Sequence, residues 1–270
     1  MKNTPIRYLL FLMLILTFGP LAFGQKPCIT NSPLGICGPY LYPQVTGSNG
    51  YNVNIQNDFW NYENAPPHSS QTMFALNPGK WFVMANFPLG NTAIETYPDS
   101  DAIYFDTSPL LNSYSYIYGS YAEDMHPRKG TDAEAAWDIG LNNWANEVMI
   151  WNNVVNRGMW AGCANWPPLA TQKFGGKDGV PVQTYYLFQC GSSELVWQLA
   201  GTGPGEGTGI TSGRTDIYNM LIWLEDYGYL PAGTFLTQIE YGFEIASTGG
   251  ENEKFEVHGW SITASHGGQD

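Results

Sequence analysis

The sequence predicts an all-β protein, a β-jelly-roll sandwich of two antiparallel sheets with one external α-helix. First, aromatic residues make up 15% of the 270 residues and charged residues only 13%, a composition that excludes disordered and coiled-coil proteins. Second, 31 glycines and 18 prolines supply many turns. Third, short runs of alternating apolar and polar residues recur between these turns, whereas only one segment has helical spacing. A parallel α/β fold would need many more helices.

The N-terminal residues have the pattern of a secretory signal peptide. Lys2 and Arg7 precede an uncharged apolar run over residues 8–23, which ends in small residues. A membrane-spanning helix is the competing interpretation, but a Gly-Pro pair interrupts the run. We therefore expect residues 1–24 to be a signal peptide, and residues 25–270 to form a single domain that is secreted to the extracellular space.

The charge balance narrows the range of partners. The chain has 24 acidic and 11 basic residues, for a net charge of −13. Such an acidic protein is a poor partner for nucleic acid. No segment after the N-terminal run has about 18 consecutive apolar residues, so we expect no membrane partner. We expect a monomer.

The four cysteines, Cys28, Cys37, Cys163 and Cys190, contain no Cys-x-x-Cys pair, which disfavours zinc ribbons and thioredoxin-like sites. The simplest pairing joins Cys28 to Cys37 and Cys163 to Cys190. Four cysteines permit three connectivities, and four buried free thiols are the alternative. The four histidines form no cluster with metal-ligand spacing.

The strand pattern occurs in ten segments. These segments are Asn52–Ile55, Trp81–Asn86, Ala93–Tyr97, Tyr114–Tyr121, Ala133–Leu141, Glu147–Val155, Gln183–Gln189, Leu195–Ala200, Ile239–Ser247 and Phe255–Thr263. A single helix is predicted to begin after Thr215 as N-cap and to end before Gly228, because apolar residues recur there at helical spacing.

Alternation within one strand places a carboxylate beside aromatic and thioether side chains. In the predicted strand Glu147–Val155, one side has Glu147, Met149 and Trp151. The other side has Val148, Ile150 and Val154. We interpret the aliphatic side as the core. A strand face exposed to water normally has short polar or charged residues, so the side of Glu147 is predicted to line a cleft.

Two further strands place an acid opposite their apolar stripe. Glu244 lies on the side away from Tyr241 and Phe243, and Asp138 lies on the side away from Trp137 and Ile139. Paired carboxylates in an aromatic cleft suit the cleavage of glycosidic bonds. The alternative interpretation is that these three acids are ordinary surface residues, since 24 acids make coincidences common.

Five short segments resemble glycoside hydrolase family 12. Asn146–Trp151 is similar to the strand that holds the family's nucleophile, and Ala135–Ile139 to the strand whose Asp contacts it. Tyr241–Ile245 resembles the acid/base strand. Asn57–Trp60 resembles an N-terminal motif that supplies a sugar-stacking Trp, and Glu95–Pro98 resembles a Tyr-Pro strand. The departures from the family pattern are Asp58 in place of Asn and Ile245 in place of Pro.

The resemblance implies a retaining endo-β-1,4-glucanase that acts on a β-glucan polysaccharide. Glu147 would be the nucleophile, Glu244 the acid/base and Asp138 the residue that orients Glu147. The candidate substrate-binding residues are Trp60, Asn57, Met149, Trp151, Trp144 and Tyr97. We expect no metal and no organic cofactor in this reaction.

Two classes of non-catalytic protein remain as alternatives. A secreted carbohydrate-binding jelly-roll module would explain the aromatic residues equally well, and a structural jelly roll would leave the acids without a role. Neither alternative explains acids at family positions on separate strands. The sequence leaves open whether the preferred polymer is cellulose, mixed-linkage β-glucan or xyloglucan.

Overall fold

The computed structural model describes residues 28–41, 52–103, 109–156, 167–202 and 209–267. The predicted signal peptide lies outside these residues. Among the described residues there is no helix with the length and apolar character needed to cross a membrane.

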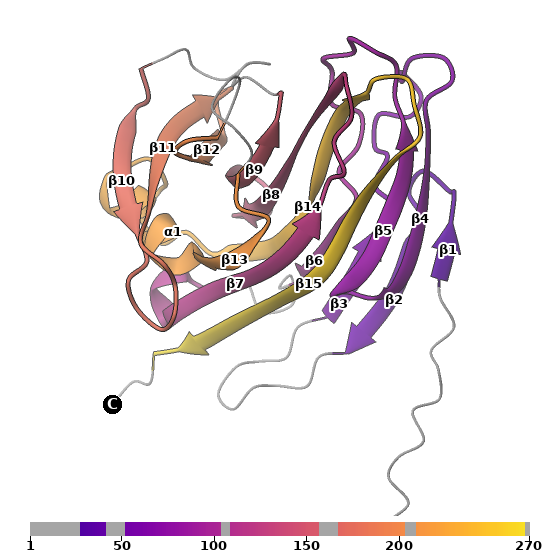
Figure 1. Ribbon diagram of the computed structural model, residues 1–270. Helices are drawn as coiled ribbons and strands as arrows, with labels where there is room; N and C mark the ends of the chain where they lie inside the picture. Colours follow the sequence, from indigo (N-terminus) through magenta and orange to yellow (C-terminus); the bar gives the residue numbers. More distant parts are fainter. Residues whose placement is uncertain (1–27, 42–51, 104–108, 157–166, 203–208, 268–270) are drawn as a thin grey trace, which may run out of the picture.

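The described strands form two sheets that face each other (Figure 1). The six-stranded sheet has, in spatial order, β1 (Cys28–Thr30), β4 (Ser70–Asn77), β5 (Lys80–Asn86), β15 (Glu253–His266), β7 (Tyr114–Asp124) and β13 (Ser212–Asp216). The nine-stranded sheet has, in spatial order, β10 (Ala170–Phe174), β11 (Gln183–Cys190), β12 (Glu194–Leu199), β9 (Asn146–Val155), β8 (Thr131–Leu141), β14 (Leu236–Thr248), β6 (Asp99–Ile103), β3 (Asn52–Gln56) and β2 (Ile36–Leu41). The predicted all-β jelly-roll sandwich is confirmed.

One pair of strands departs from the predicted antiparallel arrangement. Strand β12 runs parallel to β9, with Glu194 in register with Glu147. The antiparallel strands β10, β11 and β12 lie between β9 and the sheet edge, which brings β12 back beside β9 in the same direction. The nine-stranded sheet is therefore mixed.

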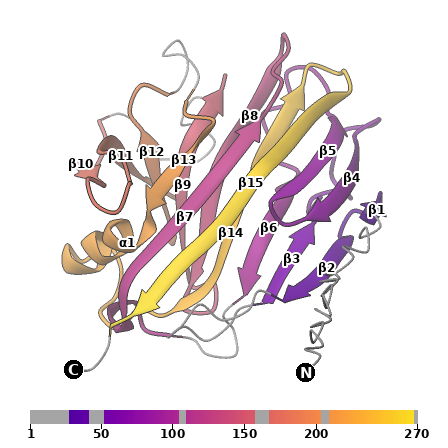
Figure 2. The same ribbon diagram turned by 60° about the horizontal axis from the view of Figure 1, so that its bottom comes forward.

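The predicted helix is present as α1 (Ile217–Asp226), the one α-helix among the described residues, and it packs beside β7 (Figure 2). Its N-cap is Asp216, whose side chain accepts a hydrogen bond from the Asn219 amide at 3.3 Å. The prediction of Thr215 as the N-cap is therefore wrong by one residue. The Thr215 hydroxyl accepts a hydrogen bond from Trp137 Nε1 at 3.2 Å and does not cap the helix.

All but one of the predicted strands occur, with shifted ends. The exception is Ala93–Tyr97, which is a loop with a single bridge between Thr96 and Ile245. Besides the 3.4 Å bond from the Ile245 amide to the Thr96 carbonyl, its backbone bonds to the loop that follows β3, where the Tyr97 amide donates to the Asp58 carbonyl at 2.8 Å. The sequence pattern missed β1, β2, β4, β6, β10 and β13.

A β-bulge in β9 corrects the predicted side of one residue. Ala135 pairs with Asn153 and Ala136 pairs with Trp151, so Asn152 is an extra residue in β9. Val154, predicted on the core side, therefore lies with Met149 and Trp151 on the opposite face. Val148 and Ile150, before the bulge, pack in the main core as predicted.

The disulfide between Cys28 and Cys37 is confirmed. It joins the beginning of β1 to β2, which belong to different sheets. Cys190 is also disulfide-bonded. Cys163, its predicted partner, lies outside the described residues.

Candidate active site

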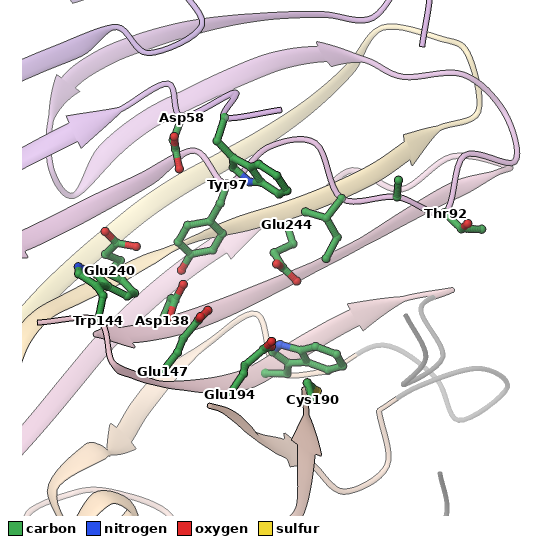
Figure 3. Close-up of a pocket in the computed structure, with 14 residues that line it drawn as sticks. Asp58, Thr92, Tyr97, Asp138, Trp144, Glu147, Cys190, Glu194, Glu240 and Glu244 are labelled. Atoms are coloured by element: carbon green, nitrogen blue, oxygen red, sulfur yellow. The ribbon is translucent and has the colours of Figure 1, made fainter. Parts of the chain in front are cut away.

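The concave face of the nine-stranded sheet contains an open cavity of about 580 Å³ (Figure 3). Its walls come from β8, β9 and β14, from the start of β12, and from the loops that surround Asp58 and Ile94. Seven of the nine predicted site residues line it, namely Glu147, Glu244, Asp138, Trp60, Trp144, Trp151 and Tyr97. The cavity is therefore the candidate active site.

Strand β8 places the three predicted catalytic carboxyls on one face. It lies between β9, which has Glu147, and β14, which has Glu244. Gly140 of β8 pairs with Glu147, so Asp138, two residues away, is the diagonal neighbour of Glu147 on the same face. Figure 3 shows Glu147 and Glu244 directed into the cavity, with Asp138 close to Glu147.

Asp138 and Glu147 share a hydrogen bond that separates their protonation states. Burial is the largest cause that raises the pKa of Asp138 well above its ordinary value, followed by the charge of Glu147. Burial and the charge of Glu244 raise the pKa of Glu147, whereas the hydrogen bond with Asp138 lowers it. The direction of these shifts favours a proton on Asp138 over a proton on Glu147.

Three tryptophans give the cavity flat apolar surfaces. Trp60 is 51% exposed and Trp144 is 39% exposed, so both rings are accessible to a ligand. Trp151 is buried apart from the surface that reaches the cavity. Aromatic rings of this kind are suited to stacking against the C–H faces of sugar rings.

The position of Trp144 depends on glycine at residue 140. A Cβ atom on Gly140 would lie 2.5 Å from the Trp144 ring, so only glycine leaves room for the ring on the sheet. Trp144 itself has a positive φ of 63°, which is unusual for a bulky residue. Its Nε1 donates a hydrogen bond to Gln238 at 3.3 Å. The ring is thus held over the strand that pairs with Glu147.

Tyr97 forms part of the cavity floor. It is buried, and its hydroxyl donates a hydrogen bond to the Ala136 carbonyl at 3.0 Å. The loop that contains it passes so close to β14 that a Cβ atom on Gly242 would lie 2.1 Å from the Pro98 carbonyl oxygen. Gly242 therefore allows this loop to approach the acid-bearing strand.

Two predicted substrate-binding residues do not line the cavity. Asn57 is fully buried, and its side-chain amide donates to the Ser32 carbonyl at 2.8 Å and accepts a hydrogen bond from Gln71. Met149 is 2% exposed and packs with Val154 beneath the cavity. Both residues can support the site only indirectly.

The sequence analysis did not select several residues that line the cavity. They include Asp58, Glu194 and Glu240, and the loop 92–94. Burial raises the pKa of Asp58 to about 6. Glu240 could have been selected from the sequence, because alternation places it on the same face of β14 as Glu244, four residues away. Asp58 could have been selected because it is an acid at a position where the family 12 motif has asparagine.

The cavity is strongly acidic. No lysine or arginine is among the described residues that line it, whereas six acids are, namely Asp58, Asp138, Glu147, Glu194, Glu240 and Glu244. Burial raises the pKa of Glu240 well above its ordinary value, and the charge of Asp101 raises it further. Within the described part of the chain, Asp99, Asp101 and Glu240 are the one acidic group whose oxygens lie close enough to hold a metal ion.

Comparisons with known proteins give a consistent fold. No family model and no curated protein matches the chain. Among solved structures, the xyloglucanase domain of NopAA from Sinorhizobium fredii, in complex with cellobiose, is 20% identical and has a TM-score of 0.61. The alignment covers 88% of this chain and 99% of that domain.

Two further structures agree. A native family 12 xyloglucanase from Bacillus licheniformis is 17% identical, with a TM-score of 0.63 and coverage of 88% of this chain and 100% of that chain. Endoglucanase 3 of family GH12 from Trichoderma harzianum is 14% identical, with a TM-score of 0.63 and coverage of 89% and 98%. The chain therefore has the fold of the family 12 glycoside hydrolases over most of its length.

Proposed function

We propose that the chain is a retaining endo-β-1,4-glucanase of glycoside hydrolase family 12, secreted and active on internal β-1,4 linkages of a glucan polymer. The observation that carries the proposal is the placement of Glu147 and Glu244 on either side of one open, tryptophan-lined cavity. The family 12 fold, which the solved xyloglucanases and endoglucanase share with this chain, supports the same conclusion.

The hydrogen-bonding environment assigns different roles to the two glutamates. Glu147 receives a hydrogen bond from Asp138, which favours its anionic form. In the described part of the chain, Oε2 of Glu244 is buried and has no hydrogen-bond partner. We therefore assign Glu147 as the nucleophile, and Glu244, which also lines the cavity, as the proton donor.

The reaction proceeds in two displacements. Glu147 attacks the anomeric carbon while Glu244 protonates the glycosidic oxygen, which leaves with the reducing-end fragment. Glu244, now ionised, then takes a proton from water as the water attacks the glycosyl–Glu147 ester. Asp138 orients Glu147 and stabilises its charge before attack and after release.

The shape of the cavity favours a polymeric substrate. Trp60 and Trp144 both line the cavity and are both exposed, so sugar rings can stack on more than one tryptophan. The NopAA domain was solved with cellobiose, a β-1,4-linked glucose disaccharide, which agrees with a glucan as substrate. The predicted N-terminal leader and the Cys28–Cys37 disulfide support an extracellular location.

The test uses Glu147→Gln, which removes the nucleophile and keeps the side-chain size. We expect kcat on a soluble β-glucan to fall by about 10³-fold or more, with cellotetraose still bound in calorimetry. Glu251→Gln, the same change at an exposed turn, is the matched control and should retain activity. The anomer first released should be β, as NMR of early product can determine.

Three results would contradict parts of the proposal. Binding of cellotetraose by wild-type protein without any hydrolysis would indicate a carbohydrate-binding module. Activity of Glu147→Gln near that of wild type would exclude Glu147 as nucleophile. Release of the α-anomer would exclude retention while leaving hydrolysis intact.

A further inference from the structure

Three buried carboxyls form a group that the hydrolytic mechanism does not use, and one of them, Glu240, lines the cavity. Asp99 and Asp101 are two residues apart on β6, on the same face of the strand. Asp101 pairs directly with Glu240 of the neighbouring strand β14. One carboxylate oxygen from each of the three lies within 4.8 Å of the other two.

Three carboxylate oxygens of this group, two on Asp99 and one on Asp101, lack hydrogen-bond partners within the described part of the chain. Asp99 is 1% exposed, and neither of its carboxylate oxygens has a hydrogen bond within the described part of the chain. Oδ1 of Asp101, also 1% exposed, has none either. No lysine, arginine or histidine of the described residues forms an ion pair with these acids. Buried, unpaired carboxyls are costly unless something neutralises them.

We propose that the carboxyls of Asp99, Asp101 and Glu240 bind a divalent cation, with Ca²⁺ as the preferred ion. Ca²⁺ contacts oxygen ligands at about 2.3–2.6 Å, so two oxygens on opposite sides of one ion are separated by about twice that distance. The 4.8 Å limit of the group is within this separation. One oxygen of Asp99, a residue whose two carboxylate oxygens both lack partners within the described part of the chain, is among the three that lie this close together.

Neighbouring amides hold two of the carboxyls in place. Gln56 Nε2 donates to Asp101 at 3.0 Å, and Gln238 donates to Glu240. Gln238 also accepts the hydrogen bond from Trp144, so the acids and the sugar platform share a partner. With oxygen ligands alone, the group favours Ca²⁺ over zinc or copper, which prefer nitrogen and sulfur.

The charges around the group are all of one sign. Burial raises the pKa of Asp101 to about 7 and raises the pKa of Asp99 well above its ordinary value. The charges of Asp58 and Asp138 add to the effect on Asp99. No basic side chain of the described residues forms an ion pair with these acids, and this arrangement favours a bound cation.

The bound ion would join β6 to β14 and reduce the negative potential beside Asp138. Its effect is on stability, because none of its ligands is a proposed catalytic residue. Cation binding can be measured without glucan, so its failure would leave the proposed hydrolysis untouched.

The experiment measures thermal unfolding and calorimetric binding of EDTA-treated protein at pH 7.5 with CaCl₂. We expect one Ca²⁺ per chain and a rise in Tm of about 5–10 °C at a hundred times Kd. MgCl₂ should give a smaller rise, since Mg²⁺ sheds its water reluctantly. NaCl at equal ionic strength is the control for screening.

Two variants locate the site. Asp99→Asn and Asp101→Asn keep the side-chain size, and each should lose most of the Ca²⁺-dependent rise in Tm. Asp226→Asn, with the same loss of charge at the exposed end of α1, should retain it. Absence of calorimetric binding in wild type, or an equal rise in Tm in all four proteins, would overturn the proposal and leave protons as the neutralising species. If Asp99→Asn fails to fold, Asp101→Asn alone decides.

Discussion

Replacement of Gly140 by alanine tests whether Trp144 is a sugar platform held by the sheet. The new methyl group would lie 2.5 Å from the Trp144 ring, whereas an ordinary carbon contact needs about 3.5 Å. The ring must therefore move by about 1 Å. Such a shift breaks the hydrogen bond from Trp144 to Gln238, which is already 3.3 Å long. The backbone of Gly140 does not have a positive φ, so alanine adds no backbone strain.

The expected magnitude follows from how freely the ring can move. Overpacking costs about 1–3 kcal/mol in a closed core, and we expect about 1 kcal/mol here because Trp144 is 39% exposed and can yield outward. Loss of stacking is worth about 0.5–1.5 kcal/mol, which raises KM about 2- to 10-fold. Because neither residue transfers a proton, kcat should change less than KM.

A double-mutant cycle supplies the measurement. Urea unfolding and glucan kinetics are compared for wild type, Gly140→Ala, Trp144→Ala and the double variant. In the Trp144→Ala background the methyl group meets no ring, so the stability cost and the KM effect of Gly140→Ala should both disappear. Equal costs in both backgrounds would refute the reasoning, since the effect of Gly140→Ala would then not depend on the ring.

Three other changes test the electrostatics and the covalent link. Asp138→Ala removes the donor that lowers the pKa of Glu147, so the acid limb of the kcat/KM profile should move to higher pH, and kcat should fall about 10²-fold. Asp138→Asn keeps a hydrogen-bond donor and should shift the acid limb less. A shift equal to that of Asp138→Ala would contradict this role for Asp138. Burial raises the pKa of Glu123 from its ordinary 4.5 to about 8, so the folded state retains a proton that the unfolded state releases, and stability falls as pH rises through that window. Glu123→Gln should therefore reduce the slope of unfolding free energy against pH by up to about 1.4 kcal/mol per unit, and parallel slopes for variant and wild type would contradict the assignment. Replacement of both Cys28 and Cys37 by serine removes a disulfide between residues nine apart in the sequence. Chemical denaturation should show that the free energy of unfolding falls by about 2–3 kcal/mol. Unchanged stability would mean that the disulfide does not restrict the unfolded chain.

The positions of the proposed catalytic carboxyls were predictable because their strands are long and alternate clearly. In β14, Ile239, Tyr241 and Phe243 are fully buried, so Glu240 and Glu244 must point to the other face. The cavity lining agrees with that inference. In a stretch of strand without a bulge, alternation alone decides on which face of the sheet a side chain lies.

Other parts of the site depend on contacts that no local pattern contains. Strand β6 begins Asp-Ser-Asp, a sequence typical of a turn, and becomes a strand because β3 and β14 pair with it on both sides. Val154 changes face because of one extra residue in β9, and a bulge is decided by the pairing with β8. Trp144 adopts a positive φ after Asn142 and Asn143, which both do so too. Its ring direction then follows from Gly140.

The acidic face of the sheet is maintained at a cost in stability that the opposite face offsets. Asp99, Asp101 and Glu240 are buried, although burial disfavours their charged forms, and amides at these positions would not have that penalty. The same strand β14 compensates, since its alternate residues contribute large side chains to the core. Residues that break local rules without a gain in stability are expected at functional sites. The concentration of such acids on one face of the sheet, beside a cavity lined by tryptophans, is therefore an argument for function that does not depend on resemblance to any other protein.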